Sequence, residues 1–189
     1  FHSRAKDIYR IQYNQWQNGK LRFECAAAVP AVGPALKNNF PEVKRFTRLF
    51  PISGGARYES PDRGVIEFRE EKMQITDSSV FEVFDINLIT GDNATSLAGP
   101  DKVVMSERAI RKYFADEDPL GKTISWDGSR KFEVTGIFEN LPENSHIKFD
   151  FLFSYGTLNR ETKNASESAW GWYDFNTYVL LQPGTDAKA

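Results

Sequence analysis

The residue types that most often carry catalysis are scarce in this chain. It has one cysteine, Cys25, and two histidines, His2 and His146. A thiol nucleophile needs a neighbouring base and an electropositive setting that lowers its pKa. Cys25 instead lies in an Ala-rich apolar run, where a buried and unreactive cysteine is the usual case. We therefore predict that the chain is not an enzyme, and a single cysteine provides no disulfide framework.

The spacing of the remaining polar residues also disfavours metal and nucleotide sites. Two distant histidines cannot form the paired His and Cys patterns of zinc sites, and Asp85, Asp92 and Asp101 match no calcium loop. Residues 119–122 (P-L-G-K) have a glycine and a lysine, as phosphate-binding loops do, but lack the first glycine and the following helix of such loops. We predict a turn there, and no cofactor and no metal in this domain.

Aromatic residues are the best candidates for binding. Trp170, Trp172, Tyr173 and Phe175 lie within six residues of one another. Clustered rings can stack on sugars or anchor a protein partner, but they can also fill the core beneath a last strand, which is the interpretation we favour. Phe50 and Ile52 precede a Gly-Gly segment, and we expect them at an exposed tip that contacts a partner.

Composition narrows the class of protein. The chain has 189 residues, of which 40% are hydrophobic and 26% charged, as in an ordinary folded domain. Its net charge of −2 gives no electrostatic case for nucleic acid or for an anionic membrane surface. No apolar run approaches the ~20 residues that cross a bilayer. The chain begins at Phe1 rather than Met, so we expect it to be a piece of a longer protein.

Turn and cap signals divide the chain into short strands and a few helices. Residues 18–19 (N-G) and 127–128 (D-G) predict hairpin turns, and residues 53–55 (S-G-G) and 60–64 are expected to bound a loop-rich patch. Alternating apolar residues predict strands at 8–16, 21–28, 43–50, 65–69, 72–75, 88–89, 101–105, 122–126, 131–138, 147–151 and up to 181. Helices are expected at 30–39, 78–84, 107–114 and 154–164, the second capped by Asp77 or Ser78 and the third by Ser106. Trp16 and Trp126 lie on expected strands and are predicted to be structural. Because strands dominate, the fold class is α+β.

The order of several motifs resembles a known family. D-P-L-G-K-T-I at 118–124 is followed by F-E-V-T-G-I-F at 132–138 and by L-P-E-N-S-H-I-K-F-D-F at 141–151. Together with residues 1–11, 78–84, 88–92 and 177–181, this series is similar to the extracytoplasmic domain of MacB-type ABC transporter permeases. These permeases belong to the wider FtsX-like superfamily, and the likeness is closest to those of Bacteroidetes-like bacteria. It covers essentially the whole chain.

The resemblance implies an architecture and a function. It implies two lobes, a porter-like mixed α/β lobe formed by residues 1–83 and 146–189, and an inserted small β-rich lobe, called Sabre in the family, at 84–145. It places the domain on the periplasmic side of the inner membrane. The implied partners are its own transmembrane helices, a second permease copy, a cytoplasmic ABC ATPase, and a periplasmic adaptor or outer-membrane channel. The implied activity is mechanotransmission, which couples ATP hydrolysis to export or release of a peptide, lipoprotein or small molecule.

A different class of function remains open from the residues alone. A secreted or surface module could bind a ligand such as a glycan through Trp170, Trp172 and Tyr173. Exposed, coplanar rings would favour this alternative, and buried rings would count against it. For the permease hypothesis, we expect the two chain ends, Phe1 and Ala189, to lie on one side of the domain.

Overall fold

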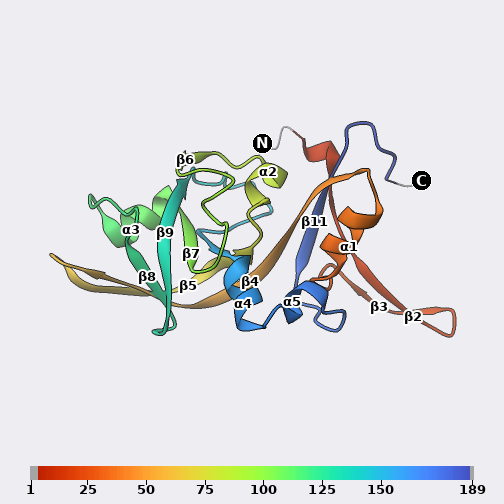
Figure 1. Ribbon diagram of the computed structural model, residues 1–189, viewed down its shortest axis with the longest axis horizontal. Helices are drawn as coiled ribbons and strands as arrows, with labels where there is room; N and C mark the ends of the chain where they lie inside the picture. The colour runs from red at the N-terminus through yellow and green to blue at the C-terminus, as the bar shows by residue number, and fades with distance from the viewer. Residues whose placement is uncertain (1–3, 188–189) are drawn as a thin grey trace.

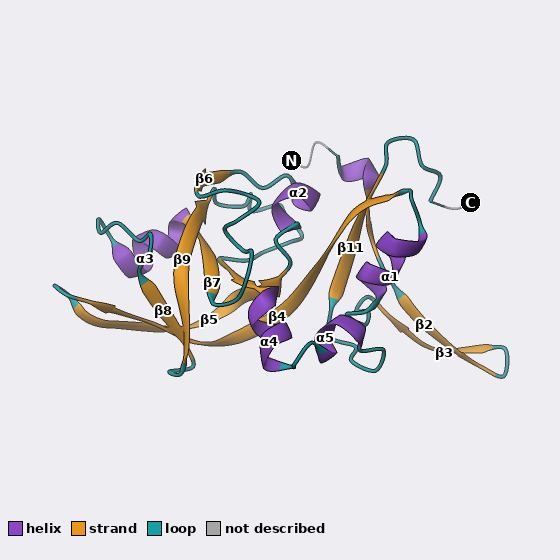
Figure 2. Ribbon diagram, viewed as in Figure 1, coloured by secondary structure: helices purple, strands orange, loops and turns teal. Residues whose placement is uncertain are grey.

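The computed structural model describes residues 4–187 and confirms the α+β class. Short helices surround a long twisted sheet, and a small hairpin extends from the body (Figure 1, Figure 2). Among the described residues the strands are β1 (Ile8–Arg10), β2 (Tyr13–Gln17), β3 (Lys20–Cys25), β4 (Val43–Ser60), β5 (Gly64–Thr76), β6 (Leu88–Thr90), β7 (Lys102–Ser106), β8 (Thr123–Trp126), β9 (Arg130–Phe138), β10 (Phe151–Ser154) and β11 (Asn176–Leu181). The helices are η1 (Ala5–Asp7), α1 (Val32–Asn39), α2 (Val80–Phe84), α3 (Glu107–Phe114), α4 (Tyr155–Glu161) and α5 (Ala165–Ser168).

The main sheet closes on itself. Strands pair in the order β4, β5, β10, β7, β9 and β8, and β8 returns to β4 through Ala56 and Arg57. The resulting barrel-like ring is extended by β6 beyond β9, and by β11 and β1 beyond β4. Strands β2 and β3 form a separate two-stranded sheet.

Strand alternation divides the interior into two cores. On β7, Val103 and Met105 face a core that includes α3, whereas Val104 faces a second core that includes α2. On β10, Phe151 and Phe153 face the first core and Leu152 the second. Because side chains of a strand point alternately to its two faces, a strand covered on both faces is buried throughout, as β10 is.

Several local predictions are confirmed. Ser106 caps α3, its hydroxyl oxygen accepting the N–H of Ala109 at 3.2 Å. Residues 18–19 and 127–128 form the tight turns of the β2–β3 and β8–β9 hairpins, with φ of +51° and +71° in the first and +46° and +74° in the second. Asn-Gly and Asp-Gly suit these positions because both tolerate positive φ.

The long hairpin of β4 and β5 was not predicted. The expected strand 43–50 continues to Ser60, and the expected loop at residues 53–55 lies inside β4, next to a bulge opposite β5. The expected strands 65–69 and 72–75 are one strand, β5. Pairing with β5, β8 and β11 satisfies the main chain of β4, and this overrides the local preference of Pro51 and of the glycines for loops.

Two further local predictions are wrong. Residues 147–150 are irregular, and strand β10 begins only at Phe151. Asp77 does not cap α2, because its carboxylate accepts hydrogen bonds from Arg48 on β4. Ser79, the residue before α2, instead donates its hydroxyl to the carbonyl of Phe46 at 2.5 Å.

The strands nearest the two chain ends lie side by side. β1 pairs antiparallel with β11, and Ile8, where β1 begins, is opposite Leu180, near the end of β11. Figure 1 shows η1 and the segment after β11 on the same side of the molecule. Phe1 and Ala189 themselves lie outside the described residues. None of the described helices is long and apolar enough to span a membrane.

Candidate functional site

The aromatic segment at residues 170–175 is partly core and partly surface. Trp172 is half-buried against Phe50 and Phe175, with ring centroids 5.3 Å and 4.9 Å away. Trp170 is 62% exposed and Tyr173 is 41% exposed. The favoured interpretation, that the whole cluster fills the core, is therefore correct for Phe175, correct in part for Trp172, and wrong for Trp170 and Tyr173.

Phe50 and Ile52 do not form the predicted exposed tip. Both lie within β4, and both are partly buried against the core that includes α3. Phe50 stacks on Phe175 with a centroid distance of 4.9 Å. The tip was expected because a Gly-Gly segment follows them, but that segment continues the strand. A role for the two residues in partner contact remains a prediction.

The β2–β3 hairpin carries exposed aromatic residues that sequence reasoning missed. Trp16, expected to be structural, is 63% exposed, and Phe23 is also exposed. Trp126 is buried, as predicted. The hairpin itself was predicted, but its alternation did not show that the rest of the fold leaves both of its faces uncovered. An isolated two-stranded hairpin is only marginally stable in water, so exposed rings there add little to folding.

One contact joins the hairpin to the aromatic segment. Tyr13 of β2 packs on Tyr173 with ring centroids 4.9 Å apart. We call the exposed rings of both segments, Trp16, Phe23, Trp170 and Tyr173, together with Tyr13, the aromatic edge. In Figure 1 the hairpin and the loop after α5 lie on the side of the molecule away from the described chain ends. Large exposed rings at one edge are typical of protein contact surfaces.

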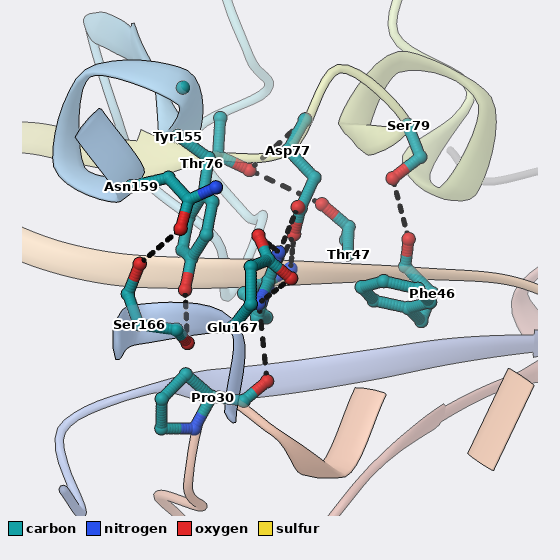
Figure 3. Close-up of polar contacts among 12 residues, drawn as sticks. Pro30, Phe46, Thr47, Thr76, Asp77, Ser79, Tyr155, Asn159, Ser166 and Glu167 are labelled. Carbon is teal, nitrogen blue, oxygen red and sulfur yellow. Dashed lines mark hydrogen bonds and ion pairs between the residues drawn. The ribbon is translucent and has the colours of Figure 1, made fainter. Parts of the chain in front are cut away.

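Arg48 is the most deeply buried charged side chain of the described protein, at 2% exposure. Its guanidinium donates to both carboxylate oxygens of Asp77, at 2.6 Å and 3.0 Å, and its main-chain N–H also donates to Asp77, at 2.8 Å. It donates to Glu167 at 3.3 Å and 3.4 Å and to the carbonyl of Pro30 at 3.2 Å (Figure 3). It also lies over the Tyr155 ring, 3.6 Å from its centroid.

These contacts fix the protonation states of the network. Burial by itself would lower the pKa of Arg48, but hydrogen bonds to Asp77 and its negative charge raise that pKa above its ordinary value. Burial raises the pKa of Tyr155 to about 12, although the charge of Arg48 acts in the opposite direction. The tyrosine hydroxyl donates to the carbonyl of Ser166 at 3.0 Å. Each group is partnered, so the network fastens loops and helices to β4 and offers no reactive atom.

A second polar cluster fastens the β4–β5 hairpin to the end of α3. Glu117 accepts hydrogen bonds from Tyr58 and Ser60, both at 2.6 Å, from Lys122 at 2.5 Å and from Arg63 at 3.2 Å. The bonds from Lys122, Ser60 and Tyr58 lower the pKa of Glu117 from its ordinary 4.5 to about 2. Residues 119–122 form a turn, as predicted, and their lysine serves this cluster.

Cys25 and His146, which were weighed as catalytic or metal-binding residues, lie in different parts of the structure. Cys25 ends β3, where its sulfur accepts the N–H of Ala27 at 3.3 Å. His146 lies at a surface hollow beside Ile8, Phe84 and Tyr178, and His2 lies outside the described residues. Among residues 4–187, no group of three or more His, Cys, Asp or Glu is placed to hold a metal ion.

Asp92 and Asp101 have structural partners. Asp92 accepts the main-chain N–H groups of Ala94 and Thr95, both at 3.0 Å. Asp101 forms an ion pair with Arg160 at 2.5 Å. Asp85 follows α2 in the left-handed conformation. These contacts stabilise turns and helix ends.

The fold has solved relatives. A domain of a proposed permease protein from Porphyromonas gingivalis superposes with a TM-score of 0.79 at 22% identity, covering 100% of this chain and 78% of that one. The periplasmic region of MacB from Actinobacillus actinomycetemcomitans gives 0.67 at 16% identity, with 97% and 78% covered. The extracellular domain of the noncanonic ABC-type transporter YknZ from Gram-positive bacteria gives 0.62 at 17%, with 94% and 84% covered.

Comparison with curated protein sequences found no match. The family model of the MacB-like periplasmic core domain, in contrast, matches residues 1–189, which is the whole chain. The match agrees with the fold shared with these solved structures and with the motif series at residues 118–151. The chain therefore belongs to the MacB-like periplasmic core domain family, the periplasmic domains of ABC transporter permeases.

Proposed function

We propose that this domain couples ATP hydrolysis by a cytoplasmic ABC ATPase to a conformational change outside the inner membrane. In this proposal the permease's own transmembrane helices carry the motion to the domain, and a second permease copy moves with it. The movement exports or releases a peptide, lipoprotein or small-molecule cargo. A periplasmic adaptor or outer-membrane channel is the proposed partner of the aromatic edge, which lies away from the described chain ends.

The pairing of β1 with β11 is the observation that carries this proposal. The strands that follow and precede the chain ends are neighbours in the main sheet, with Ile8 opposite Leu180. A displacement of adjacent membrane helices would therefore reach one strand pair, and β11 passes it directly to β4, which runs into the closed ring.

The Arg48 network supports transmission over a distance. Arg48 lies on β4, and its contacts hold the segments around Pro30, Asp77, Tyr155 and Glu167 against that strand. A movement of β4 would therefore carry two helices and two loops with it instead of deforming the sheet locally. Packed cores resist continuous deformation, so motion passes through them as movement of whole elements.

The division into a porter-like lobe and an inserted Sabre-like lobe, 84–145, stays part of the proposal. Strands β4 and β5 would connect the two lobes, because the first half of β4 pairs with β11 and its second half pairs with β8. Hydrogen exchange would test the division. If the domain has two lobes, the main-chain amides on the two sides of β4 should exchange with two different opening free energies. One uniform value would contradict the division into lobes.

A spin-label experiment tests the coupling. Ser129 is exposed in the β8–β9 turn. It would be replaced by Cys in a full-length permease that also carries Cys25→Ala, and this spin-labelled permease would be reconstituted with the ATPase. We expect the distance between the two labelled copies to change when nucleotide is trapped with vanadate. An ATPase variant that cannot bind ATP is the control. Identical distance distributions with and without trapped nucleotide would refute the coupling.

The geometry gives less support to the glycan-binding alternative. Stacking on sugars needs exposed, coplanar rings, but Trp172 is half-buried and lies edge-on to Phe175 at 82°. Tyr173 is tilted by 44° against Tyr13. Only Trp170 and Tyr173 would remain for such a surface. A glycan array, followed by ligand-dependent melting of any hit, decides between the two functions, because the permease proposal expects no hit that depends on Trp170.

A further inference from the structure

The arm formed by β4 and β5 has an open strand edge. β5 pairs with β10 only through residues 73–76, and the carbonyl of Lys72 still accepts the N–H of Asp150 at 2.7 Å. For residues 64–71, β4 is the only main-chain partner within the described chain. Figure 1 shows this hairpin extending beyond the rest of the sheet. Unpaired N–H and C=O groups in a row are a template for a further strand.

The side chains of this edge are exposed and carry both signs of charge. Glu67 and Arg69 are exposed, and among residues 4–187 neither belongs to an ion pair. Arg57 lies opposite Glu67 on β4, but its guanidinium is paired with Glu59 at 2.7 Å. Phe68, between the two charges, is also exposed, with one face packed on Tyr113. The ammonium of Lys112 also lies over this ring, 4.1 Å from its centroid, and the remaining exposed part of Phe68 is open to a partner.

We propose that this edge pairs with the same edge of a second copy of the chain, antiparallel and centred on Phe68. In that register each Glu67 lies opposite the partner's Arg69, so two cross-strand pairs of opposite charge form about the two-fold axis. Phe68 lies opposite Phe68 of the partner subunit. Opposite charges and aromatic pairs directly across two antiparallel strands are stabilising, and an interface of this kind is self-complementary.

The two neighbouring symmetric registers are worse. The two-fold axis of an antiparallel pair passes through a pair of opposite residues, so the centre moves by whole residues. Centring on residue 67 sets Glu67 against Glu67 of the partner subunit, and centring on residue 69 sets Arg69 against Arg69 of the partner subunit and Glu67 against the partner's Glu71. Like charges directly opposite destabilise strand pairing. Charged residues on an edge usually discourage pairing altogether. Here their order, E-F-R-E-E at 67–71, discourages those shifted registers and favours the Phe68-centred one.

The small size of the contact suggests where it forms. Eight residues of paired strand are far fewer than the 20–30 residues a side of a standard interface. Two free domains would therefore not remain associated through this edge alone. Copies held side by side in one transporter have a raised effective concentration, which favours weak contacts. In this respect the inference rests on the proposed permease function.

Cysteine cross-linking in the full-length permease, in its membrane and with Cys25→Ala, tests the register. Phe68→Cys should form a disulfide-linked dimer under mild oxidation, because directly opposite residues have Cα atoms about 4.5–5.5 Å apart. Val65→Cys is the matched control on the same exposed edge. In the proposed register the two copies of residue 65 are six positions apart, about 20 Å, and should not cross-link.

Charge reversal tests the same pairing without altering Phe68. Glu67→Arg alone, or Arg69→Glu alone, places like charges opposite each other twice and should weaken association of the copies by about 4- to 30-fold. The double variant E67R/R69E exchanges the pairs and should restore it. A double variant no better than either single variant overturns the proposal. So does equal cross-linking at residues 65 and 68, or a Phe68→Cys cross-link to a different protein.

The outcome separates this inference from the proposed function. A permease that is dimeric in the membrane, moves with nucleotide and still fails to cross-link through residue 68 refutes the edge contact alone. A chain that does not associate with an ABC ATPase contradicts the transport function instead. Both measurements use the same full-length protein.

Discussion

Replacing Arg48 by Met is the sharpest test of the buried network. The substitution removes a charge that is 2% exposed and leaves Asp77, whose side chain is 16% exposed, without its cation. Met has a similar length and can lie in the place of the Arg48 side chain beside the Tyr155 ring. The expected loss of stability therefore comes from the Asp77 carboxylate, which is left without a cation, and from the unpaired carbonyl of Pro30. A cavity contributes only to a small extent.

The magnitude follows from burial. Removing one partner of a buried ion pair costs about 3–5 kcal/mol, because the other charge is left uncompensated in a region of low dielectric constant. Total stability of a domain is about 5–15 kcal/mol, so most of it could be lost. For a chain of this length, each kcal/mol lowers Tm by about 2–4 °C, which gives a decrease of about 6–20 °C.

The two carboxylates should contribute unequally. Asp77 makes three hydrogen bonds of 2.6–3.0 Å to Arg48, whereas Glu167 makes two of 3.3–3.4 Å and its side chain is 40% exposed. Asp77→Ala should approach the cost of Arg48→Met. Glu167→Ala should cost less than about 1 kcal/mol, because water and salt screen an exposed pair.

Urea unfolding of the purified domain, followed by circular dichroism, measures these differences. The matched control is Arg57→Met, on the same strand, whose guanidinium pairs with a Glu59 that is 73% exposed. The control should stay within about 1 kcal/mol of the wild type. The argument is wrong if Arg48→Met is as stable as Arg57→Met, or if Glu167→Ala destabilises as much as Asp77→Ala.

Three further outcomes are expected from the same unfolding measurements. Trp172→Ala should lose about 1–3 kcal/mol, because its half-buried ring packs against the core, whereas Trp170→Ala should change stability by less than about 0.5 kcal/mol; equal losses would contradict the division of the aromatic segment. Ser106→Ala should cost about 1–2 kcal/mol, since it removes the α3 cap and a 2.7 Å hydrogen bond to Asp150, and a neutral change would show that neither contact matters. The folded-state pKa of Glu117 is lowered to about 2, so its contribution is present above its ordinary 4.5 and is lost as pH falls toward 2. Glu117→Gln should therefore flatten the loss of stability between about pH 5 and about pH 2.5, and an unchanged pH profile would count against this assignment.

Locally coded features were predictable from the sequence. The cap at Ser106, the turns at residues 18–19 and 127–128 and the turn at 119–122 depend on a few neighbouring residues, and the structure has each of them. The motif series from 118 to 151 also indicated the family, because its order and spacing reflect the elements of one fold. The scarcity of nucleophiles and bases led to the prediction that the chain is not an enzyme, and the relatives are transporter domains.

What the sequence could not reveal depends on contacts between distant residues. Pro51 and residues 53–55 are loop-formers by themselves, yet they lie in an 18-residue strand because three other strands pair with it. Asp77 has the residue type of a helix cap, but the fold places Arg48 beside it, and the charge-assisted bonds determine its role. Which aromatic rings are buried was likewise decided by what packs over them.

The sequence by itself thus determined the α+β class, the tight turns, the cap at Ser106 and the family, because these depend on residue types at fixed spacings. The tertiary structure alone decided that the sheet closes into a ring, that the strands nearest the two ends are neighbours, and that β5 keeps an open edge. The physical reason is that every residue type except proline carries the same main-chain N–H donor and C=O acceptor. Only the placement of whole strands determines which N–H and C=O groups find a partner and which remain free for another chain.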